Sequence, residues 1–294
     1  MKYLIPLLAF YFLIGCDGEK RNETNPPEAI SVSPNLKYEI KGDAVTITGC
    51  DKKASGELII AAIIEGKPVT SIGKSAFSRC YSLTSIRIPD SVTSIGELAF
   101  TYCTSLTSIT IPDSVNSIGE GSFYLCSSLT SITIGNGVTS IGGGAFGDCS
   151  SLTSVTIPNG VTSIGNGAFG DCSSLTSVTI PDGVTSIGLK TFDECSSLKS
   201  ITIPDSVTSI GYAAFFDCSS LTNITIPNGV TSIGEGAFYG CNSLTAVTFL
   251  GDAPEIENDA FKDSSLSTIY RKPDAKGWGD TPVGRPVKLI TENP

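Results

Sequence analysis

The 294-residue sequence has no histidine, one tryptophan, one methionine and few charged residues. Without histidine, the chain cannot form a Ser-His-Asp or Cys-His catalytic group or give zinc an imidazole ligand. Charged residues make up 16% of the chain, whereas soluble proteins contain about a quarter. The 19 basic residues are outnumbered by 29 acidic ones, which argues against nucleic-acid binding because phosphate requires a basic surface. The hydrophobic content of 40% argues against disorder.

The N-terminus has the organisation of a bacterial export signal. Lys2 supplies one positive charge, and residues 4–14 are largely apolar but too few to span a membrane as a helix, which takes about 20. The run ends in Leu-Ile-Gly-Cys at Cys16, which resembles the lipobox of bacterial lipoproteins, whose cysteine is acylated and becomes the new N-terminus. We expect residues 1–15 to be a lipoprotein signal peptide, Cys16 to be the lipidation site and the polar residues 16–34 to be a flexible tether. The alternative is an ordinary signal peptide that happens to end in cysteine.

A period of 23 residues runs through most of the remaining chain. A fixed period of this length is typical of a solenoid, in which each repeat is one coil. Identical positions then stack into rows along the axis, and stability comes from contacts between neighbouring coils. The residues that keep the period are eight cysteines (Cys80, Cys103, Cys126, Cys149, Cys172, Cys195, Cys218 and Cys241) and nine phenylalanines (Phe77, Phe100, Phe123, Phe146, Phe169, Phe192, Phe215, Phe238 and Phe261).

Each repeat has a recognisable local pattern. Leu106, Ile109 and Ile111 give the L-x-x-L-x-L opening of a leucine-rich repeat. The alternating Ser-Ile-Thr-Ile segment predicts a strand, which ends at Pro112 because proline has no amide hydrogen. A second short strand is predicted at 115–118, and one helical or 3-10 turn at 120–126.

The repeats are flanked by irregular segments that are expected to cap the array. Residues 35–68 predict a capping hairpin and strand, and residues 69–270 predict the repeat solenoid. The unit after Phe261 loses one residue, and Ser264 replaces the cysteine. Residues 271–294, with Trp278 and an apolar run at 287–290, predict a C-terminal cap that shields the open end of the stack.

The repeat string Val-Thr-Ser-Ile-Gly-x-x-Ala-Phe-x-x-Cys-x-Ser-Leu-Thr-Ser-Ile-Thr-Ile-Pro resembles the BspA-like family of bacterial leucine-rich repeat proteins. The resemblance covers residues 69–270 and implies a leucine-rich-repeat solenoid, mainly parallel β, with short helical or 3-10 turns. Departures from the string are Gly135 in place of proline, Ser122 in place of alanine and Ser264 in place of cysteine.

The cysteines and acidic residues are candidates for chemistry. Stacked cysteines lie within disulfide distance of one another, yet each follows a core phenylalanine by three residues, which favours a ladder of buried thiols. The cysteines lack the paired spacing typical of zinc sites, and Cys50 falls outside the period. An acidic residue precedes several of these cysteines, and such a row could bind calcium or cleave glycans, but the repeat itself explains it as a solvated edge. The row consists of Asp148, Asp171, Glu194 and Asp217.

Two surfaces are candidates for binding. The strand face carries rows of serine and threonine, which resemble ice-binding ladders or are simply soluble residues suited to strands. The turn side is where the repeats differ, and variable positions on a fixed frame are where a solenoid presents recognition residues. Exposed tyrosines are enriched at interfaces but are also common without any partner. The candidate binding residues are Tyr81, Tyr102, Tyr124, Leu125, Leu189, Tyr212, Phe216 and Tyr239.

These observations predict a non-enzymatic protein that is exported, lipid-anchored to the bacterial cell envelope at the outer membrane or cell surface, and binds macromolecules. The BspA-like resemblance implies adhesion to host matrix proteins or to other cells. The alternative is a lipoprotein that binds or handles glycans without catalytic activity of its own. We expect an extracellular protein or glycan as partner, a membrane anchor at the N-terminus, and no cofactor, metal or nucleic acid.

Overall fold

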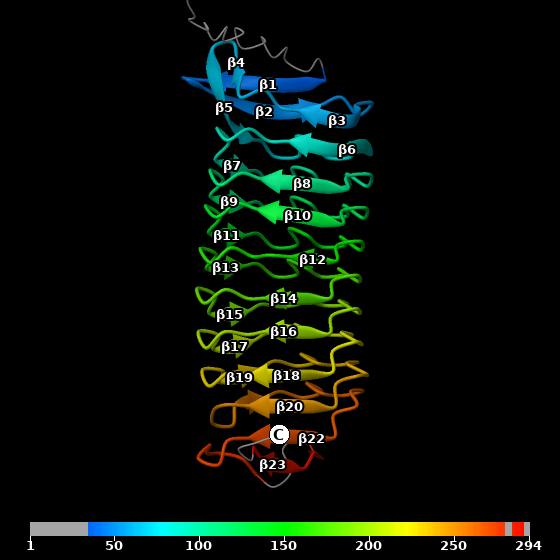
Figure 1. The fold of residues 1–294 in the computed structure, drawn as a ribbon, viewed down its shortest axis with the longest axis vertical. Helices are drawn as coiled ribbons and strands as arrows, with labels where there is room; N and C mark the ends of the chain where they lie inside the picture. Colours follow the sequence, from blue (N-terminus) through cyan, green and yellow to red (C-terminus); the bar gives the residue numbers. More distant parts are fainter. Residues whose placement is uncertain (1–34, 280–283, 291–294) are drawn as a thin grey trace, which may run out of the picture. The chain divides into compact units, whose positions relative to one another are not determined.

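A computed structural model of the chain describes residues 35–279 and 284–290. They belong to one compact unit, Val32–Pro294, in which successive coils stack along one axis (Figure 1). The expected signal peptide, tether and lipidation site at Cys16 lie outside the described residues.

Each coil contributes one strand to each of two columns (Figure 1). Most neighbouring strands in a column pair in parallel, and within the regular repeats the paired residues are 23 positions apart, so that Ser108 lies beside Ser131 and Ile109 beside Ile132. The first column consists of β3 (Ser55–Ile59), β6 (Ser82–Arg87), β8 (Ser108–Ile111), β10 (Ser131–Ile134), β12 (Ser154–Val155), β14 (Ser177–Thr179), β16 (Ser200–Thr202), β18 (Asn223–Ile226), β20 (Ala246–Phe249) and β22 (Thr268–Arg271). The second column consists of β5 (Lys67–Ile72), β7 (Ser94–Ile95), β9 (Ser117–Ile118), β11 (Ser140–Ile141), β13 (Ser163–Ile164), β15 (Ser186–Ile187), β17 (Ser209–Ile210), β19 (Ser232–Ile233) and β21 (Glu255–Ile256).

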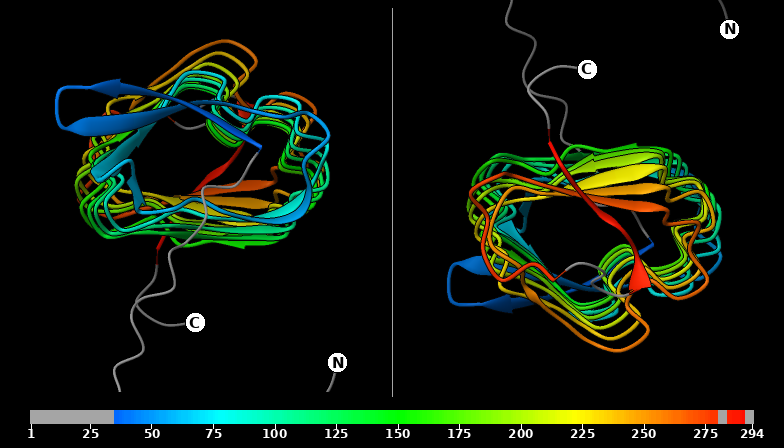
Figure 2. Two further views of the ribbon diagram at one scale, coloured as in Figure 1. Left: turned by 90° about the horizontal axis from the view of Figure 1, so that it is seen from above. Right: turned by 90° about the horizontal axis from the view of Figure 1, so that it is seen from below.

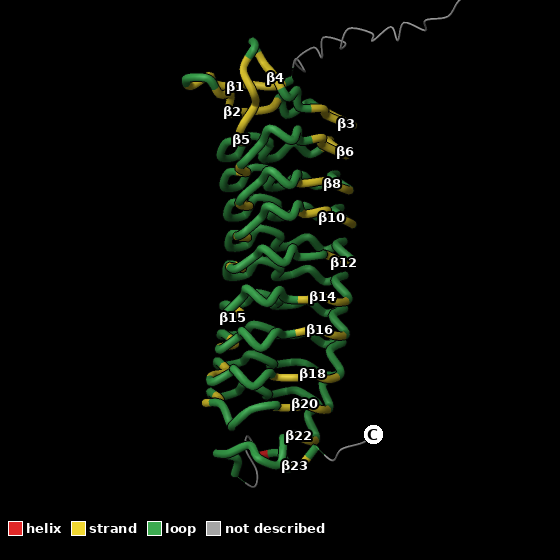
Figure 3. Tube along the Cα trace, turned by 60° about the vertical axis from the view of Figure 1, so that its left-hand side comes forward, coloured by secondary structure: helices red, strands yellow, loops and turns green. Residues whose placement is uncertain are grey.

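The predicted leucine-rich-repeat solenoid and both strands of the repeat are therefore confirmed, but the helical turn is not. The segment from Gly119 to Cys126 consists of consecutive turns, and most of each coil is loop or turn (Figure 3). Gly121 and Leu125 have positive φ angles of 57° and 59°, which a right-handed helix or 3-10 helix does not contain. Amides in this segment alternate: that of Phe123 donates to the Ala145 carbonyl in the next coil, and that of Tyr124 donates within the turn to Gly121.

In most coils, the glycine of the Ser-Ile-Gly sequence lies against the backbone of the preceding coil. At Gly119 the φ angle is not in the positive region, so its conformation does not require glycine. A Cβ atom at Gly119 would instead lie 2.6 Å from the backbone nitrogen of Glu97 in the preceding coil. Because contacts below 3 Å between such atoms do not occur without movement of the backbone, any other residue would push the two coils apart.

The core is a column of phenylalanine rings that runs through the stack. Eight of the nine rings are completely buried, and Phe261 at the C-terminal end is 5% exposed. Successive rings lie 5.0–5.6 Å apart between centroids, with interplanar angles of 4–16°. This offset parallel geometry is favoured by the quadrupole of the rings and adds to the free energy gained by burying them.

The cysteines form a second buried row, as the sequence pattern favoured. All cysteines of the described residues are free and buried. From Cys103 to Cys241, each thiol donates to the carbonyl oxygen of the phenylalanine one coil earlier, at 3.1–3.2 Å. Burial raises the pKa of Cys103 and of Cys241 to about 12, and it raises the pKa of Cys149, midway along the row, well above the ordinary value.

Irregular elements close both ends of the described stack. Strands β1 (Leu36–Lys41) and β2 (Ala44–Cys50) form an antiparallel hairpin, and β2 continues the second column by pairing with β5. Viewed along the axis, the hairpin extends beyond the outline of the coils (Figure 2). The two-residue strand β4 (Ile63–Ile64) pairs antiparallel with β5. At the other end β23 (Val287–Leu289) pairs with β22, and the Trp278 ring packs 4.7 Å from that of Phe249.

The spacing of the coils predicts unequal effects of alanine at two equivalent glycines. A Cβ atom at Gly137 would lie 1.9 Å from the carbonyl oxygen of Asp113, whereas one at Gly160, one coil later, would come no closer than 3.3 Å to any backbone atom. We expect Gly137→Ala to lower the free energy of unfolding by about 1–3 kcal/mol, because overpacking displaces the backbone. Gly160→Ala is the matched control and should change it by less. Guanidinium unfolding of both variants measures the difference, and equal stabilities would contradict this account of the spacing.

The thiol row predicts that stability falls at alkaline pH. The folded chain keeps these thiols protonated above the ordinary cysteine pKa of 9.0, whereas the unfolded chain releases the protons. Because the unfolded state then binds fewer protons, the free energy of unfolding decreases as pH rises above 9, by up to about 1.4 kcal/mol per pH unit for each thiol. Urea unfolding at pH 8, 9 and 10 measures this slope.

Tyrosine and lysine also titrate in this range, so a cysteine variant provides the control. Cys149→Ala removes one completely buried thiol. It should be less stable than the wild type at pH 8 because of the cavity, but its stability should decline less steeply above pH 9. Parallel curves for the two proteins would show that the Cys149 thiol does not cause the decline.

Candidate functional site

The positions where the repeats differ lie on the turn segments. We define the turn face by four positions in each coil. The first and second positions are the residues three and two places before the core phenylalanine, and the third and fourth are the residues one and two places after it. The second and fourth of these positions have positive φ in every coil from Phe77 to Phe261. A left-handed backbone costs most residues about 1–2 kcal/mol, whereas glycine adopts it freely and asparagine and aspartate tolerate it. The backbone therefore limits which residues can occupy half of the turn face.

Near the N-terminal cap, the turn face carries a first aromatic cluster. The rings of Tyr102 and Tyr124 meet edge to face with centroids 6.4 Å apart, and the Arg79 guanidinium lies 5.7 Å from the centre of the Tyr102 ring. Tyr102 is 37% exposed and Tyr124 36%. Leu125, half-buried, occupies the Tyr102 position one coil later. Tyr102 and Leu125 both have positive φ, although neither residue type favours it.

A second aromatic cluster lies further along the same face. The Phe216 and Tyr239 rings are stacked with centroids 4.9 Å apart and planes within 5°, and the Lys262 ammonium lies 5.9 Å from the centre of the Tyr239 ring. Leu189 and Tyr212 occupy one position in consecutive coils and are 44% and 47% exposed.

The structure thus brings seven of the eight predicted residues into aromatic pairs or equivalent positions of neighbouring coils on the turn face, and it leaves Tyr81 apart. Tyr81 is 48% exposed but follows Cys80, outside the turn-face positions. The pair Leu189 and Tyr212 lies on the turn face with the second cluster, but at a different position within the coil. The predicted residues therefore form separate clusters of contacting rings and neighbouring side chains.

The sequence analysis missed a hollow between the two clusters. In the coils of Phe146 and Phe169, turn-face positions that carry side chains elsewhere are occupied by Gly143, Gly144, Gly147, Gly167 and Gly170. The hollow has a volume of about 520 Å³. The signal that could have revealed it is this concentration of glycines at positions that vary elsewhere. Its lining residues are Leu98, Glu120, Gly121, Tyr124, Gly143, Gly144 and Asn166.

The acidic row lies beside this hollow and is explained largely by the backbone. Asp148, Asp171, Glu194 and Asp217 occupy the last turn-face position, where φ is positive in every case and aspartate is better tolerated than most residues. With a serine from each coil they line a depression of about 420 Å³. Within the described part of the chain, no three His, Cys, Asp or Glu side chains are grouped as metal ligands.

The acidic row is not electrostatically uniform, although its members occupy equivalent positions of the repeat. Burial, followed by the charges of Glu194 and Asp148, raises the pKa of Asp171 to about 6. The Asp148 carboxylate, followed by burial, raises the pKa of the Tyr124 phenol. The acidic row therefore influences a residue of the first aromatic cluster.

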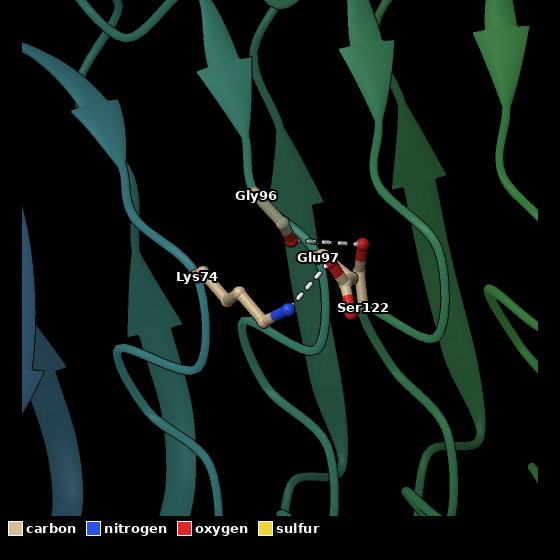
Figure 4. Close-up of polar contacts among 4 residues, drawn as sticks. All are labelled: Lys74, Gly96, Glu97 and Ser122. Carbon is tan, nitrogen blue, oxygen red and sulfur yellow. Dashed lines mark hydrogen bonds and ion pairs between the residues drawn. The ribbon is translucent and has the colours of Figure 1, made fainter.

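The turn segments near the N-terminal cap also show how the departures from the repeat are accommodated (Figure 4). Ser122, which replaces an alanine, is fully buried. Its hydroxyl donates to the carbonyl oxygen of Gly119 and lies 3.3 Å from that of Gly96. In neighbouring coils, the exposed Lys74 ammonium and Glu97 carboxylate form an ion pair at 2.8 Å. The departure at Ser122 therefore leaves no unpaired buried hydroxyl.

The strand face offers hydroxyl groups without aromatic residues. Ser108, Thr110, Ser131 and Thr133 are exposed, and the adjacent row of threonines donates to the preceding coil, as Thr107 does to the carbonyl oxygen of Thr84 at 3.1 Å. The strand face is hydroxylated and has no exposed large apolar side chain between β8 and β18. No helix in the described residues is long and apolar enough to cross a membrane.

Comparisons with known proteins agree with this architecture. The profile of the BspA type leucine-rich repeat region matches residues 59–176 and 162–280, with six copies of the repeat. The T. pallidum leucine-rich repeat protein is 30% identical with a TM-score of 0.60, and the match covers 72% of this chain and 90% of that one. A leucine-rich repeat protein from Bacteroides ovatus is 28% identical with a TM-score of 0.62, covering 88% and 76%. No curated protein matches the sequence. With the repeat profile extending over most of its length, the chain belongs to the family of proteins with the BspA type leucine-rich repeat region.

Proposed function

We propose that this chain is a bacterial lipoprotein that acts at the cell surface in adhesion, binding host matrix proteins or other cells through its turn face. The observation that carries the proposal is the pair of aromatic clusters on either side of the glycine-lined hollow. Exposed aromatic rings supply large contact areas at low entropic cost and are frequent hot spots of protein interfaces. The family membership supports a role in binding, since repeat solenoids present extended surfaces for this purpose.

Backbone strain supports the turn face over the strand face. Tyr102 and Leu125 hold φ near 60° and 59°, where glycine or aspartate would be less strained. Strain of this kind costs of order 1–3 kcal/mol per residue and is concentrated at functional sites. The strand face shows no such cost, because its serines and threonines suit the extended backbone. We therefore assign ligand contact to the turn face.

Glycan binding is the second candidate, and the composition of the hollow favours it. A tyrosine ring, a carboxylate and an amide from Tyr124, Glu120 and Asn166 converge there. An aromatic face packs against the apolar side of a sugar ring, while carboxylate and amide groups bond its hydroxyls. We propose no catalytic activity, because the chain has no histidine and the raised pKa of Asp171 arises from burial and from like charges in a row.

The turn face can be tested by removing the second cluster. We expect the triple variant Tyr212→Ser, Phe216→Ser and Tyr239→Ser to lose at least about ten-fold in affinity, since one hot spot alone contributes over 1–2 kcal/mol. Binding is measured on immobilised collagen, laminin and fibronectin and, in parallel, on a glycan array. Loss of binding to the matrix proteins supports adhesion. Loss of binding that is confined to the glycan array supports glycan binding, the second candidate function.

The control for this experiment replaces exposed apolar residues away from the turn face. Ile59 and Ile63 are 49% and 63% exposed, so Ile59→Ser with Ile63→Ser removes surface hydrophobicity without touching either cluster. This double variant should bind like the wild type. Unchanged binding by the triple variant at an unchanged melting temperature would exclude the second cluster as a contact surface.

The lipid anchor is tested at Cys16. In the producing bacterium, we expect the mature protein to begin at Cys16, to carry acyl chains there and to partition into the membrane fraction, because each buried methylene contributes about 0.8 kcal/mol of membrane affinity. Cys16→Ser should abolish acylation and release the protein from the membrane. Cys50→Ser serves as the control and should remain acylated. A mature N-terminus elsewhere, without lipid, would contradict the anchor.

A further inference from the structure

The N-terminal hairpin leaves the edge of a strand free. Within residues 35–279 and 284–290, β1 pairs with β2 and with no other strand, so it is the terminal strand of its sheet. It has six residues and lies at the end of the stack, and its hairpin extends beyond the outline of the coils (Figure 2). A free edge presents backbone N–H and C=O groups that can form a ladder with another strand.

The register of the hairpin determines which groups point to this edge. Lys41 and Ala44 lie opposite each other across a two-residue turn, where the flanking residues exchange hydrogen bonds. Since bonded and non-bonded pairs alternate along an antiparallel ladder, Tyr38 and Ile40 direct their N–H and C=O groups away from β2. The register is regular from Tyr38 to Lys41. The free edge therefore offers two donor and acceptor pairs with the spacing of an antiparallel partner.

The side chains of β1 carry charges of both signs. Lys37, Glu39 and Lys41 alternate along one face of the strand and are all exposed. The side chains of Glu39 and Lys41 are 58% and 83% exposed, and their charged groups lie 3.5 Å apart. Asp43 follows in the turn and is also exposed. On the opposite face, Ile40 is 37% exposed. The edge thus combines an apolar side chain with alternating charges.

This order of charges is complementary to itself in one antiparallel register. When Ile40 lies opposite Ile40 of a second copy, Glu39 of each chain faces Lys41 of the other. Lys37 then approaches Asp43 at both ends of the ladder. A shift of two residues in either direction places Glu39 opposite Glu39 or Lys41 opposite Lys41. Because like charges directly opposite each other are destabilising and opposite charges are stabilising, the sequence selects the register centred on Ile40.

We propose that two copies of this chain form a symmetric dimer through β1, paired antiparallel with Ile40 on the twofold axis. The contact uses the same strand of both copies, as a closed twofold interface requires. It extends the sheet of the second column from one chain into the other and covers the exposed Ile40 side chains. The two stacks are joined at their N-terminal ends. This proposal does not depend on the adhesion role, although a dimer with two turn faces would gain avidity for a repetitive ligand.

The dimer is tested by exchanging the charges. Sedimentation equilibrium is measured at low ionic strength on the full chain with Cys16→Ser, so that no acyl chain is attached. We expect a monomer–dimer equilibrium. Glu39→Lys or Lys41→Glu alone should raise the dissociation constant at least about five-fold, because each change replaces two attractive pairs by two repulsive ones. An equimolar mixture of these two variants should form a heterodimer, since every facing pair between them again has opposite charges.

The matched control for the charge is Lys53→Glu, at an exposed lysine of the cap outside β1. It alters the net charge as Lys41→Glu does and should dimerise like the parent chain. A parent chain that stays monomeric at every concentration would overturn the proposal. Dimers that persist in both β1 charge variants, or a mixture of the two that associates no better than either alone, would also overturn it.

The backbone ladder is tested separately at Ile40. Ile40→Pro removes the N–H group that points to the free edge but no hydrogen bond to β2, and proline is tolerated on an edge strand in this position. It should raise the dissociation constant more than about ten-fold with the melting temperature retained, because two central hydrogen bonds of the dimer are lost. Ile40→Val keeps the N–H group and should dimerise like the parent chain. Equal dimerisation of the proline and valine variants would exclude pairing through this edge.

Discussion

The structure depends on one constraint: each coil must lie one strand spacing from the next, so that every residue meets its own counterpart 23 positions away. At that distance the backbones come close enough that Gly119 has no space for a side chain. Identical apolar side chains benefit from this, since phenylalanine rings stack at 5.0–5.6 Å and bury one another completely. Identical charges are penalised, as Asp171 shows: burial, and after it the charges of Glu194 and Asp148, raise its pKa.

The same constraint explains how much could be read from the sequence. The period, the strands and the buried rows all repeat, and repeated apolar residues must face inward, so the sequence was sufficient for the solenoid and its core. The turn conformation was not predictable in this way. A short segment such as 120–126 suits a helical turn in its composition, and the positive φ angles at Gly121 and Leu125 arise only because alternate amides bond to the next coil.

The candidate site was predictable in residue type but not in arrangement. The variable aromatic positions were recognisable because they departed from the repeat, but the repeat period contains no information on distances around the coil. It therefore could not show that Phe216 stacks on Tyr239 or that Tyr81 stands apart. The hollow was missed because glycines such as Gly143 and Gly144 define it by lacking side chains, and the sequence analysis considered only the side chains that are present. The acidic row is the opposite case, because it is conspicuous in the sequence but is explained by the backbone. Aspartate tolerates the left-handed conformation that these positions require.

The ends of the stack differ from its interior for a physical reason that connects structure with chemistry. Inside the array, each thiol donates a hydrogen bond to a phenylalanine carbonyl in the preceding coil. This bond engages the thiol proton and favours the neutral form of the cysteine. The first coil has no such neighbour, and the sulfur of Cys80 there lies 4.0 Å from the Lys52 ammonium nitrogen of the cap. A repeat gives each of its groups the same satisfied environment, and that environment ends where the repeat stops. In this chain, the turn face varies along the stack and the cap junction interrupts it, so these are the two places where the repeat no longer determines the surroundings of a residue.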